Sequence, residues 1–512
     1  RYPTDNLQGV SVGDVNGDNV SDVVVSGLND DPSTGTLPPA YLLFGPVDVS
    51  TVTDIETRAD VILDTSTLGM PLSRGGNMSD DGQQDDPNDL AFVLDTGGGT
   101  ATTTVVFGRH DWPRVLDMDY ITTGSWSFGT DYTQRFFGGL HDGNKSVHLL
   151  NFDGQGGDDL LVTSQIDWFD PPTMTAPGDD TLVVYGYIQT QPNPGAFAVP
   201  IVDTMDHDVV SDLYDRYAGV EYDGQRFPGA VANVAGDVNG DGLDDIILAS
   251  PVAAFATDAP TAVPPLGAAT IFIGRTTLPS QLHVADDFDA EFLSMSFGSG
   301  VFELGDVNHD GYDDFAVSRT REDTFDGAAG FGGLGGAWGG LLVFFGGPEY
   351  QLRDPVEGAA VQVPEVCTEQ VCPIPTVDEV ARSADILVHQ FATNATSSLS
   401  YVSQWYATAG DFDRDGRTDL AVGIPHSRSV SGFESQFIGN DLTMEPDPAT
   451  VVDEHQSGAL YVLFGVEESV RDYHLEEDDP LFEDHAPGLI LTGQGNDDQF
   501  GVVPTSPAWD LD

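Results

Sequence analysis

The sequence predicts an all-β protein built from repeats. Three observations support this: an Asp- and Gly-rich loop recurs along the chain, a short apolar run of strand length follows most copies, and no helical period of comparable length competes. The 512 residues include 59 Gly and 32 Pro, which indicates many turns. With 40% hydrophobic residues the chain can still bury a large core.

The loop has four clear copies, at 13–22, 236–245, 305–314 and 410–419. A weaker copy at 151–159 has Asn and Gln at two acidic positions, and another at 77–89 carries an insertion before Asp89. A seventh copy begins at Asp510. The seven copies start at residues 14, 77, 151, 237, 306, 411 and 510, so the separations are 63, 74, 86, 69, 105 and 99 residues. Such spacings suit a four-stranded propeller blade with variable loops and are too long for a solenoid coil.

Apolar segments of strand length follow the loops in a fixed order. The first follows the loop directly, at 22–25, 160–162, 246–249, 315–317 and 420–422. The second ends in Phe-Gly or a close variant, at 41–45, 105–108, 183–186, 271–274, 342–346 and 461–465. A more variable outer strand, such as 60–63, completes the unit. Each unit is therefore predicted to contain a strand, the loop, a strand, a turn, a third strand and an outer strand.

The loops have the donor spacing that a calcium ion needs. Calcium takes six to eight oxygen ligands, and carboxylates on alternating residues of a tight turn supply them. Side-chain oxygens would come from positions 1, 3, 5 and 9 and a carbonyl oxygen from position 7. The candidate ligands in the clear copies are Asp14, Asn16, Asp18, Val20 and Asp22; Asp237, Asn239, Asp241, Leu243 and Asp245; Asp306, Asn308, Asp310, Tyr312 and Asp314; and Asp411, Asp413, Asp415, Arg417 and Asp419. In the weaker copy they are Asn151, Asp153, Gln155 and Asp159.

The loops differ from an EF-hand, which needs Glu at position 12, because that position falls in the following strand and is Val or Leu. The alternative is an Asp/Gly turn that binds no metal, an open question above all for the copies at 77 and 151. His309, at position 4, is expected to be a solvent-facing spacer. Because the loops lie in different repeats, we expect Asp241→Ala to abolish one site and leave the others.

The repeats resemble the FG-GAP repeat of integrin α-subunits and of related bacterial and archaeal surface proteins. The resemblance is carried by the loops, by Phe-Gly pairs that precede them at 128–129, 297–298 and 500–501, and by 249–251 and 423–425 after them. It implies a seven-bladed β-propeller of four-stranded antiparallel blades, with calcium loops between the first two strands. The approximate blades are 7–64, 69–120, 125–204, 216–285, 292–355, 385–492 and an incomplete 497–512. The second repeat lacks the Phe-Gly element, and 347–400 is predicted to be an insertion. We expect residues beyond Asp512, or strands from a neighbouring subunit, to complete the last blade.

The two cysteines, Cys367 and Cys372, lie in the predicted insertion. No His or further Cys lies nearby to complete a zinc site, so a local disulfide in an oxidising compartment is expected. Two unpaired thiols are the alternative.

The formal net charge of −66, from 84 acidic and 18 basic residues, would repel nucleic acid and attract cations. Two causes compete for this excess: calcium loops consume Asp residues, and a dense acidic surface keeps a protein soluble in high salt. No apolar run has the roughly 18 residues that a membrane span needs.

These observations favour an extracellular or cell-surface, calcium-binding adhesion module whose partner is a protein, a glycan or copies of itself. A structural subunit of a surface layer or extracellular filament is one alternative, and a non-catalytic propeller of a larger secreted hydrolase is another. The chain itself is expected not to be an enzyme, because it shows no His-Glu-X-X-His motif and no Cys/His nucleophile pair.

Overall fold

The computed structural model describes a defined subset of the chain. The described residues are 5–29, 39–46, 55–64, 75–78, 87–95, 101–117, 133–136, 145–164, 181–189, 198–205, 221–222, 225–226, 231–254, 266–279, 282–283, 288–295, 297–319, 338–352, 384–391, 405–424, 459–466, 472–474 and 489–492. Within them the protein is nearly all β and consists of several small, mainly antiparallel sheets. The all-β prediction is confirmed at this level.

Six sheets follow one another along the sequence. Sheet 1 contains β1 (Asp5–Gly13), β2 (Asp22–Asn29), β3 (Ala40–Leu43) and β4 (Val61–Asp64), and sheet 2 contains β5 (Leu90–Asp95), β6 (Ala101–Val106) and β8 (Thr133–Phe136). Sheet 3 contains β9 (Lys145–Leu150), β10 (Asp159–Ser164), β11 (Thr181–Gln189) and β12 (Ala198–Met205), and sheet 4 contains β15 (Val231–Gly236), β16 (Asp245–Ala254), β17 (Leu266–Phe272) and β19 (Ala290–Met295). Sheet 5 contains β20 (Phe297–Gly305), β21 (Asp314–Arg319), β22 (Trp338–Phe344) and β23 (Ile386–Phe391), and sheet 6 contains β24 (Tyr406–Gly410), β25 (Asp419–Ile424), β26 (Ala459–Leu463) and β28 (Leu489–Thr492). A small hairpin, β13 (Glu221–Tyr222) with β14 (Gln225–Arg226), and the short α1 (Ile55–Arg58) are the other elements of the described chain.

In sheets 1, 3, 4, 5 and 6 the Asp-rich loop connects the first two strands. In sheet 4, Gly236 at the end of β15 pairs with Asp245 at the start of β16, after a shift in register that follows Val234. Gly13 and Gly305 occupy the same place in sheets 1 and 5. All three glycines have positive φ, between 67° and 83°, a conformation that favours Gly and lets the chain leave the strand sharply.

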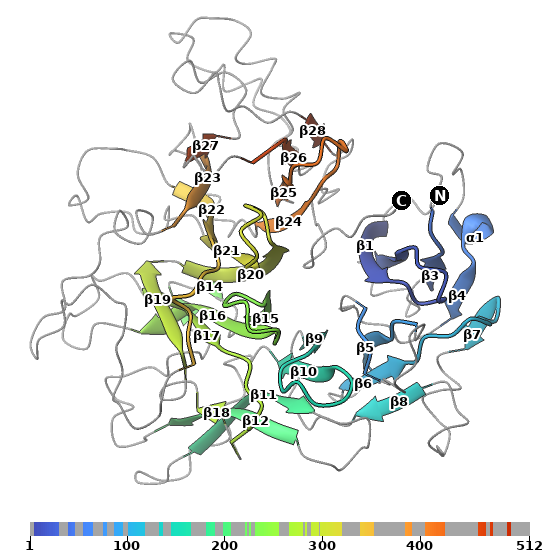
Figure 1. Cartoon of the computed structure of the whole chain (residues 1–512), viewed down its shortest axis with the longest axis horizontal. Helices are drawn as coiled ribbons and strands as arrows, with labels where there is room; N and C mark the ends of the chain where they lie inside the picture. Colours follow the sequence, from blue (N-terminus) through green and yellow to red (C-terminus); the bar gives the residue numbers. More distant parts are fainter. Residues whose placement is uncertain are drawn as a thin grey trace, which may run out of the picture.

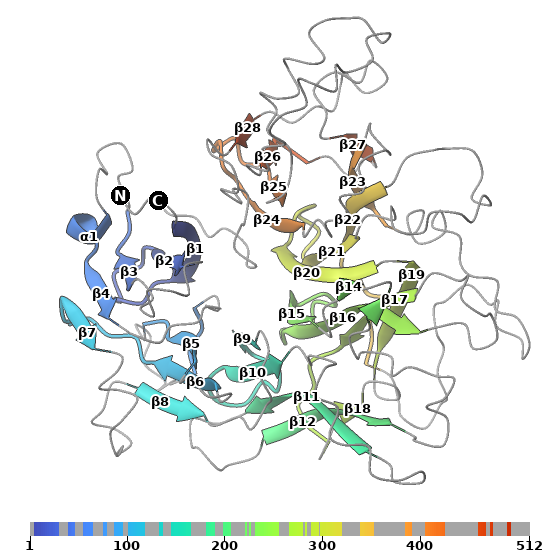
Figure 2. The same ribbon diagram turned by 180° about the vertical axis from the view of Figure 1, so that it is seen from behind.

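The sheets are arranged in an arc, with the first strand of each on the inner side (Figures 1 and 2). The innermost strands of neighbouring sheets contact one another: β5 with β9, β9 with β15, β15 with β20 and β20 with β24. Sheets 1 and 6 are the two ends of this arc in both views.

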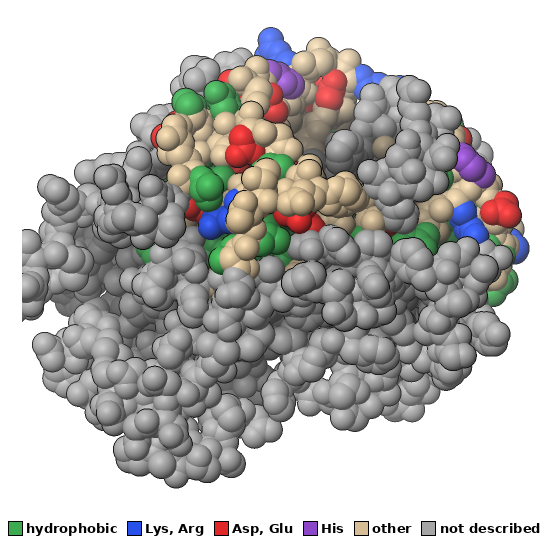
Figure 3. Space-filling model, turned by 60° about the horizontal axis from the view of Figure 1, so that its bottom comes forward, with side chains coloured by type: hydrophobic (Ala, Val, Ile, Leu, Met, Phe, Trp, Pro, Cys, Tyr) green, Lys and Arg blue, Asp and Glu red, His purple; other side chains and the backbone are tan. Residues whose placement is uncertain are grey.

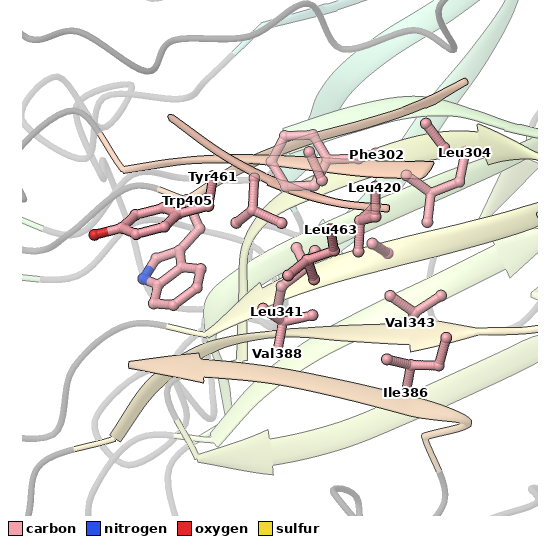
Figure 4. Packing of buried hydrophobic residues seen from close by; sticks show 14 of the residues in the cluster. Phe302, Leu304, Leu341, Val343, Ile386, Val388, Trp405, Leu420, Tyr461 and Leu463 are labelled. Atoms are coloured by element: carbon pink, nitrogen blue, oxygen red, sulfur yellow. The ribbon is translucent and has the colours of Figure 1, made fainter. Parts of the chain in front are cut away.

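Apolar layers between neighbouring sheets form the core. Between sheets 5 and 6, Phe302, Leu341, Val388, Trp405 and Tyr461 pack together, all at most 3% exposed (Figure 4). Equivalent clusters lie between sheets 1 and 2, 2 and 3, 3 and 4, and 4 and 5. Burying one such large side chain stabilises the fold by about 1.5–3 kcal/mol. Contacts between repeats therefore contribute to the stability of the fold.

Three of the outer strands gain a parallel partner from the following sheet's polypeptide. The strand β7 (Val115–Asp117) pairs with β4, β18 (Leu282–His283) pairs with β12, and β27 (Asp472–His474) pairs with β23. Along the chain, β18 and β27 follow the third strand of sheets 4 and 6, and β7 follows β6 of sheet 2. The sheets are thus joined through backbone hydrogen bonds as well as through the core.

One predicted strand end is wrong. The third strand of sheet 3 was expected to end at Gly186, but β11 continues to Gln189, and its pairing register with β12 shifts between Val184 and Gly186. Tyr185-Gly186 resembles a Phe-Gly strand end in sequence, but it lies within β11. The cysteine pair, most of the 347–400 insertion and the seventh unit lie outside the described residues. The proposed blade limits and the number seven stay predictions.

Candidate metal loops

Six loops carry the candidate ligands, and they are numbered by sheet: loop 1 (14–22), loop 2 (77–89), loop 3 (151–159), loop 4 (237–245), loop 5 (306–314) and loop 6 (411–419). In loop 4 the Asp237 carboxylate accepts hydrogen bonds from the N–H groups of Asp241 at 2.9 Å and Gly242 at 2.8 Å. Asn239 Oδ1 also accepts from Asp241 N–H, at 2.9 Å. The carboxylate of Asp241 in turn accepts from Leu243 N–H at 3.0 Å. Positions 1, 3 and 5 therefore fold the backbone around their own side chains.

The same bonding recurs in loops 1, 5 and 6. The position-1 carboxylates of Asp14, Asp306 and Asp411 accept from the N–H groups at positions 5 and 6, and the position-5 carboxylates accept from position 7. Position 6 has positive φ in each: 66° at Asn19, 92° at Gly311 and 83° at Gly416. Sequence spacing and backbone conformation thus agree across four sheets.

The position-9 aspartates are buried and connect each loop to the third strand of its sheet. In loop 5, Asp314 accepts from Val307 N–H at 2.8 Å and, through its other oxygen, from Gly346 N–H at 2.8 Å. Equivalent pairs of bonds hold Asp22, Asp245 and Asp419, and in each case the glycine that donates its N–H is that of the Phe-Gly end or its close variant. The sequence assigned position 9 a metal-binding role, and the structure adds this bracing role.

Burial raises the pKa of these carboxyl groups, because a desolvated carboxylate is unfavourable. The pKa of Asp22 rises to about 7, and those of Asp245 and Asp314 rise to about 8; hydrogen bonds from the backbone oppose the shift. The charges of Asp241 and Asp237 raise the pKa of Asp245 further, which places positions 1, 5 and 9 close enough to repel one another. A bound cation would relieve that repulsion.

Loop 6 gathers three carboxylates directly. Oxygen atoms of Asp411, Asp413 and Asp419 all lie within 4.8 Å of one another. Position 2 of this loop, Phe412, is 44% exposed, whereas Val15, Phe152 and Val238 at the same position are fully buried. The unit that would follow loop 6 lies outside the described residues.

Loop 3 departs from the pattern. Gln155, expected as the position-5 ligand, donates from Nε2 to the carbonyl oxygen of Thr276 at 2.8 Å and is exposed. One ligand of the predicted set thus has its amide engaged by the next repeat. The buried Asp159 keeps Oδ1 without a hydrogen-bond partner in the described structure, and burial raises its pKa to about 8. An oxygen in this state is a good cation ligand. In loop 2, Asn77 and Asp89 are placed at its two ends, while 79–86 lie outside the described residues.

Position 8 was missed by the sequence analysis. Asp313 of loop 5 donates its N–H to the Asp237 carbonyl oxygen of loop 4 at 3.0 Å, and its carboxylate accepts from the Asp237 N–H at 2.9 Å. We call this pair of bonds the inter-loop clasp. The doubled Asp-Asp at 158–159, 244–245 and 313–314 was its sequence signature.

Two histidines also contact neighbouring loops. His110 Nδ1 lies 2.9 Å from the Asn16 carbonyl oxygen, and Trp112 Nε1 donates to the Val15 carbonyl oxygen at 2.9 Å. His309, expected to be only a solvent-facing spacer, is exposed, but its Nε2 lies 3.3 Å from Thr418 Oγ1 of loop 6. In loop 5, the position-4 side chain therefore faces loop 6.

Oxygen donors dominate the candidate set, and their chemistry fits a hard divalent cation such as calcium. On the face drawn in Figure 3, acidic side chains are dispersed over the described surface. In the described part of the chain, no helix is both long and apolar enough to cross a membrane.

No family model matches the chain. Integrin alpha-PS5 of Drosophila melanogaster is 27% identical over 255 residues, which are 49% of this chain and 20% of that subunit. A solved structure of an Agrocybe aegerita lectin, described as recognising non-reducing terminal N-acetylglucosamine, aligns over 97% of this chain and 92% of its own, with 12% identity and a TM-score of 0.27. The chain is thus similar in sequence to an integrin α-subunit over about half of its length and spans about a fifth of that subunit.

Proposed function

We propose that the chain is a seven-bladed, calcium-binding β-propeller that acts outside the cell as a binding or adhesion module. The observation that carries this proposal is the repeated loop. In four sheets, acidic or amide side chains at positions 1, 3 and 5 organise one tight turn, and a buried carboxylate at position 9 closes it.

Charge supports calcium in these loops. Carboxylates held within a few ångströms repel one another unless a cation lies among them, and three such groups meet in loop 6. The ligands would be the side chains at positions 1, 3, 5 and 9 with the carbonyl at position 7. When bound, calcium would neutralise this charge and stiffen the turn; no catalytic step is proposed for it.

The arrangement of the sheets supports a propeller. From sheet 2 to sheet 6 the innermost strands of successive sheets contact each other, and an apolar layer lies between each pair of neighbouring sheets from sheet 1 to sheet 6. The seventh blade is proposed from the seventh loop start at Asp510.

The similarity to an integrin α-subunit supports an extracellular or cell-surface location and an adhesive role. We propose a protein or a glycan as the partner, bound without catalysis. Because the match covers about half of the chain, these statements are proposals for this chain.

Metal analysis tests the calcium proposal directly. The purified 512-residue chain is dialysed to equilibrium against buffer that contains about 1 mM calcium, and the calcium that the protein side retains in excess is counted by mass spectrometry. Several calcium ions per chain are expected, with fewer in variants that lack a position-1 carboxylate such as Asp411→Ala. A chain that retains no calcium would refute the metal assignment.

The adhesive role is tested separately. Labelled chain is applied to arrays of glycans and of extracellular proteins, in calcium and in chelator. Calcium-dependent capture by a defined array member is expected, and capture that is equal in chelator would contradict a role for the loops in binding.

A further inference from the structure

In loops 3, 4 and 5, the aspartate at position 8 links the loop to the loop before it. In the clasp between loops 4 and 5, Asp313 bonds both sides of Asp237: its N–H donates to the carbonyl at 3.0 Å, and its carboxylate accepts from the N–H at 2.9 Å. Asp237 is the first candidate ligand of loop 4. The clasp therefore fixes the backbone on both sides of that ligand.

The clasp occurs at three successive boundaries. Asp244 of loop 4 holds Asn151 of loop 3 with distances of 2.8 and 2.7 Å. Asp158 of loop 3 holds Asn77 of loop 2 with distances of 2.7 and 2.6 Å. The same pair of hydrogen bonds thus joins neighbouring sheets at three places, so it is a regular part of the fold.

The glycine before the loop makes room for the clasp. A Cβ on Gly236 would lie 2.5 Å from the Asp313 Cβ, and one on Gly76 would lie 2.6 Å from Asp158 Oδ2. Such contacts are closer than side chains tolerate, so both positions need Gly for space, and Gly236, with a φ of 83°, needs it for conformation as well. The clasp residue and the first ligand are thus held in direct proximity.

Position 8 also belongs to its own candidate site. The position-8 residue lies between two candidate ligands of its own loop, the carbonyl oxygen at position 7 and the carboxylate at position 9. An ion that orders those two residues therefore also orders the clasp. Ordering one loop then lowers the entropy cost of ordering the loop before it, which is a source of positive coupling between sites.

The chain contains its own comparison at the boundary between loops 5 and 6. There Thr418 occupies position 8, and its hydroxyl lies 3.3 Å from His309 Nε2. A threonine has no carboxylate to accept the N–H of Asp306. Loop 2 also lacks an aspartate at position 8. Its Asn88 donates the backbone N–H to the Asp14 carbonyl at 2.7 Å, which is one of the two bonds of the clasp.

We propose that loops 3, 4 and 5 bind their cations cooperatively through the aspartates at position 8, and that loop 6 binds outside this coupled group. The proposal rests on calcium binding by the loops. It differs from the sequence-based expectation that Asp241→Ala affects only its own site, because the loops are hydrogen-bonded across the sheets.

Hydrogen exchange in a calcium titration of the full chain tests the coupling. The readout is the calcium concentration that half-protects the amides of Asp241 and Gly242, both of which bond to Asp237. Asp310→Ala, which removes a candidate ligand of loop 5, is expected to raise this concentration for loop 4 by about fivefold or more. In an Asp313→Thr background, which imitates Thr418, the same change is expected to leave loop 4 unaffected.

The matched control is Asp415→Ala in loop 6. It is expected to leave the calcium dependence of the loop 5 amides, including Asp310 and Gly311, within twofold of the unmodified chain. Should Asp310→Ala leave loop 4 unchanged while calcium still protects it, the coupling is refuted and calcium binding stands. If calcium protects no loop of the unmodified chain, calcium binding itself fails, and the coupling fails with it.

A folding defect is separated from a loss of coupling by a second variant and a second measurement. Asp310→Asn keeps the side-chain size and an oxygen that can accept the Tyr312 N–H, and it replaces Asp310→Ala if that protein does not fold. Melting in chelator must match the unmodified chain for either variant. A variant that passes this test and still shifts the loop 4 titration supports the proposal.

Discussion

The carboxylate of Asp245 accepts a hydrogen bond of 2.7 Å from the backbone N–H of Gly274. Its other oxygen accepts from Val238 N–H at 3.0 Å, so one buried side chain joins loop 4 to the end of the third strand. Position 9 therefore supports the fold whether or not an ion is present.

Asp245→Ala is expected to destabilise the protein even in chelator. Two backbone N–H groups would lose their acceptor inside the protein, at a cost of about 1–3 kcal/mol each. Urea denaturation in chelator measures this. Asp241→Ala, at an exposed position, is the comparison: it should change stability in chelator by less than about 1 kcal/mol and lose stabilisation only in calcium. Equal losses for the two variants in chelator would contradict the separate roles.

Removal of calcium is expected to lower the melting temperature by many degrees. Extracellular calcium modules bind with dissociation constants of about 0.1–1 mM, so about 10 mM calcium would stabilise the native state by about 1.4–2.7 kcal/mol per site. Differential scanning calorimetry in calcium, magnesium and chelator measures this. Calcium should restore the transition better than magnesium, which prefers a tighter octahedral shell. An identical transition in all three conditions would argue against metal in the loops.

Stability in chelator is expected to fall as the pH rises. The folded-state pKa values of Asp22, Asp245 and Asp314 are raised to about 7–8, above the usual value near 4. A group with a raised pKa favours folding below its unfolded pKa, and that contribution disappears as the pH rises through the folded value. Without metal, the free energy of unfolding should therefore decrease between about pH 4 and pH 8.

Calcium should oppose this decrease in the free energy of unfolding with pH. Protons compete with the cation for the same carboxylates, so the stabilisation that calcium adds should be larger at pH 8 than at pH 5. Urea unfolding at both values, with and without calcium, measures the difference. A calcium effect that is independent of pH would show that the buried carboxylates take no part in binding.

Gly274→Ala is expected to destabilise the protein by about 1–3 kcal/mol. A Cβ at this position would lie 2.5 Å from the Leu243 Cβ and 2.9 Å from the Asp244 carbonyl oxygen. Gly242→Asn is the matched control, because nothing lies within 4 Å of a Cβ there and Asn19 adopts the same positive φ at position 6 of loop 1. Thermal melting of both variants measures the effect, and a neutral Gly274→Ala would show that this close packing is relaxed in solution.

Local spacing allowed the sequence to predict what lies within one loop. Asp237, Asn239 and Asp241 interact over two to five residues, so their pattern is visible without tertiary information. The bond between Asp313 and Asp237 joins residues 76 positions apart, so the doubled Asp-Asp at 313–314 marks the clasp aspartate in the sequence but does not reveal its distant partner. The end of β11 was misplaced for a related reason, because Gly186 marks a shift in pairing with β12 and not a strand end.

The parallel strands were also invisible to sequence reading. Two or three residues, as in β18 and β7, are too short to show an alternating pattern. Their pairing depends on the outer strand of the sheet before, which is set only when both sheets are in place.

Because β7, β18 and β27 are each added to the outer edge of the preceding sheet, the repeating segment of sequence is not a self-contained piece of structure. An excision between Asp64 and β5 would remove from sheet 1 a strand that belongs to the next segment and expose the edge of β4 to other chains. Any shortened version, insertion of a foreign domain or rearranged order of segments should therefore keep each outer edge together with the strand that covers it, cutting after β7 rather than before β5.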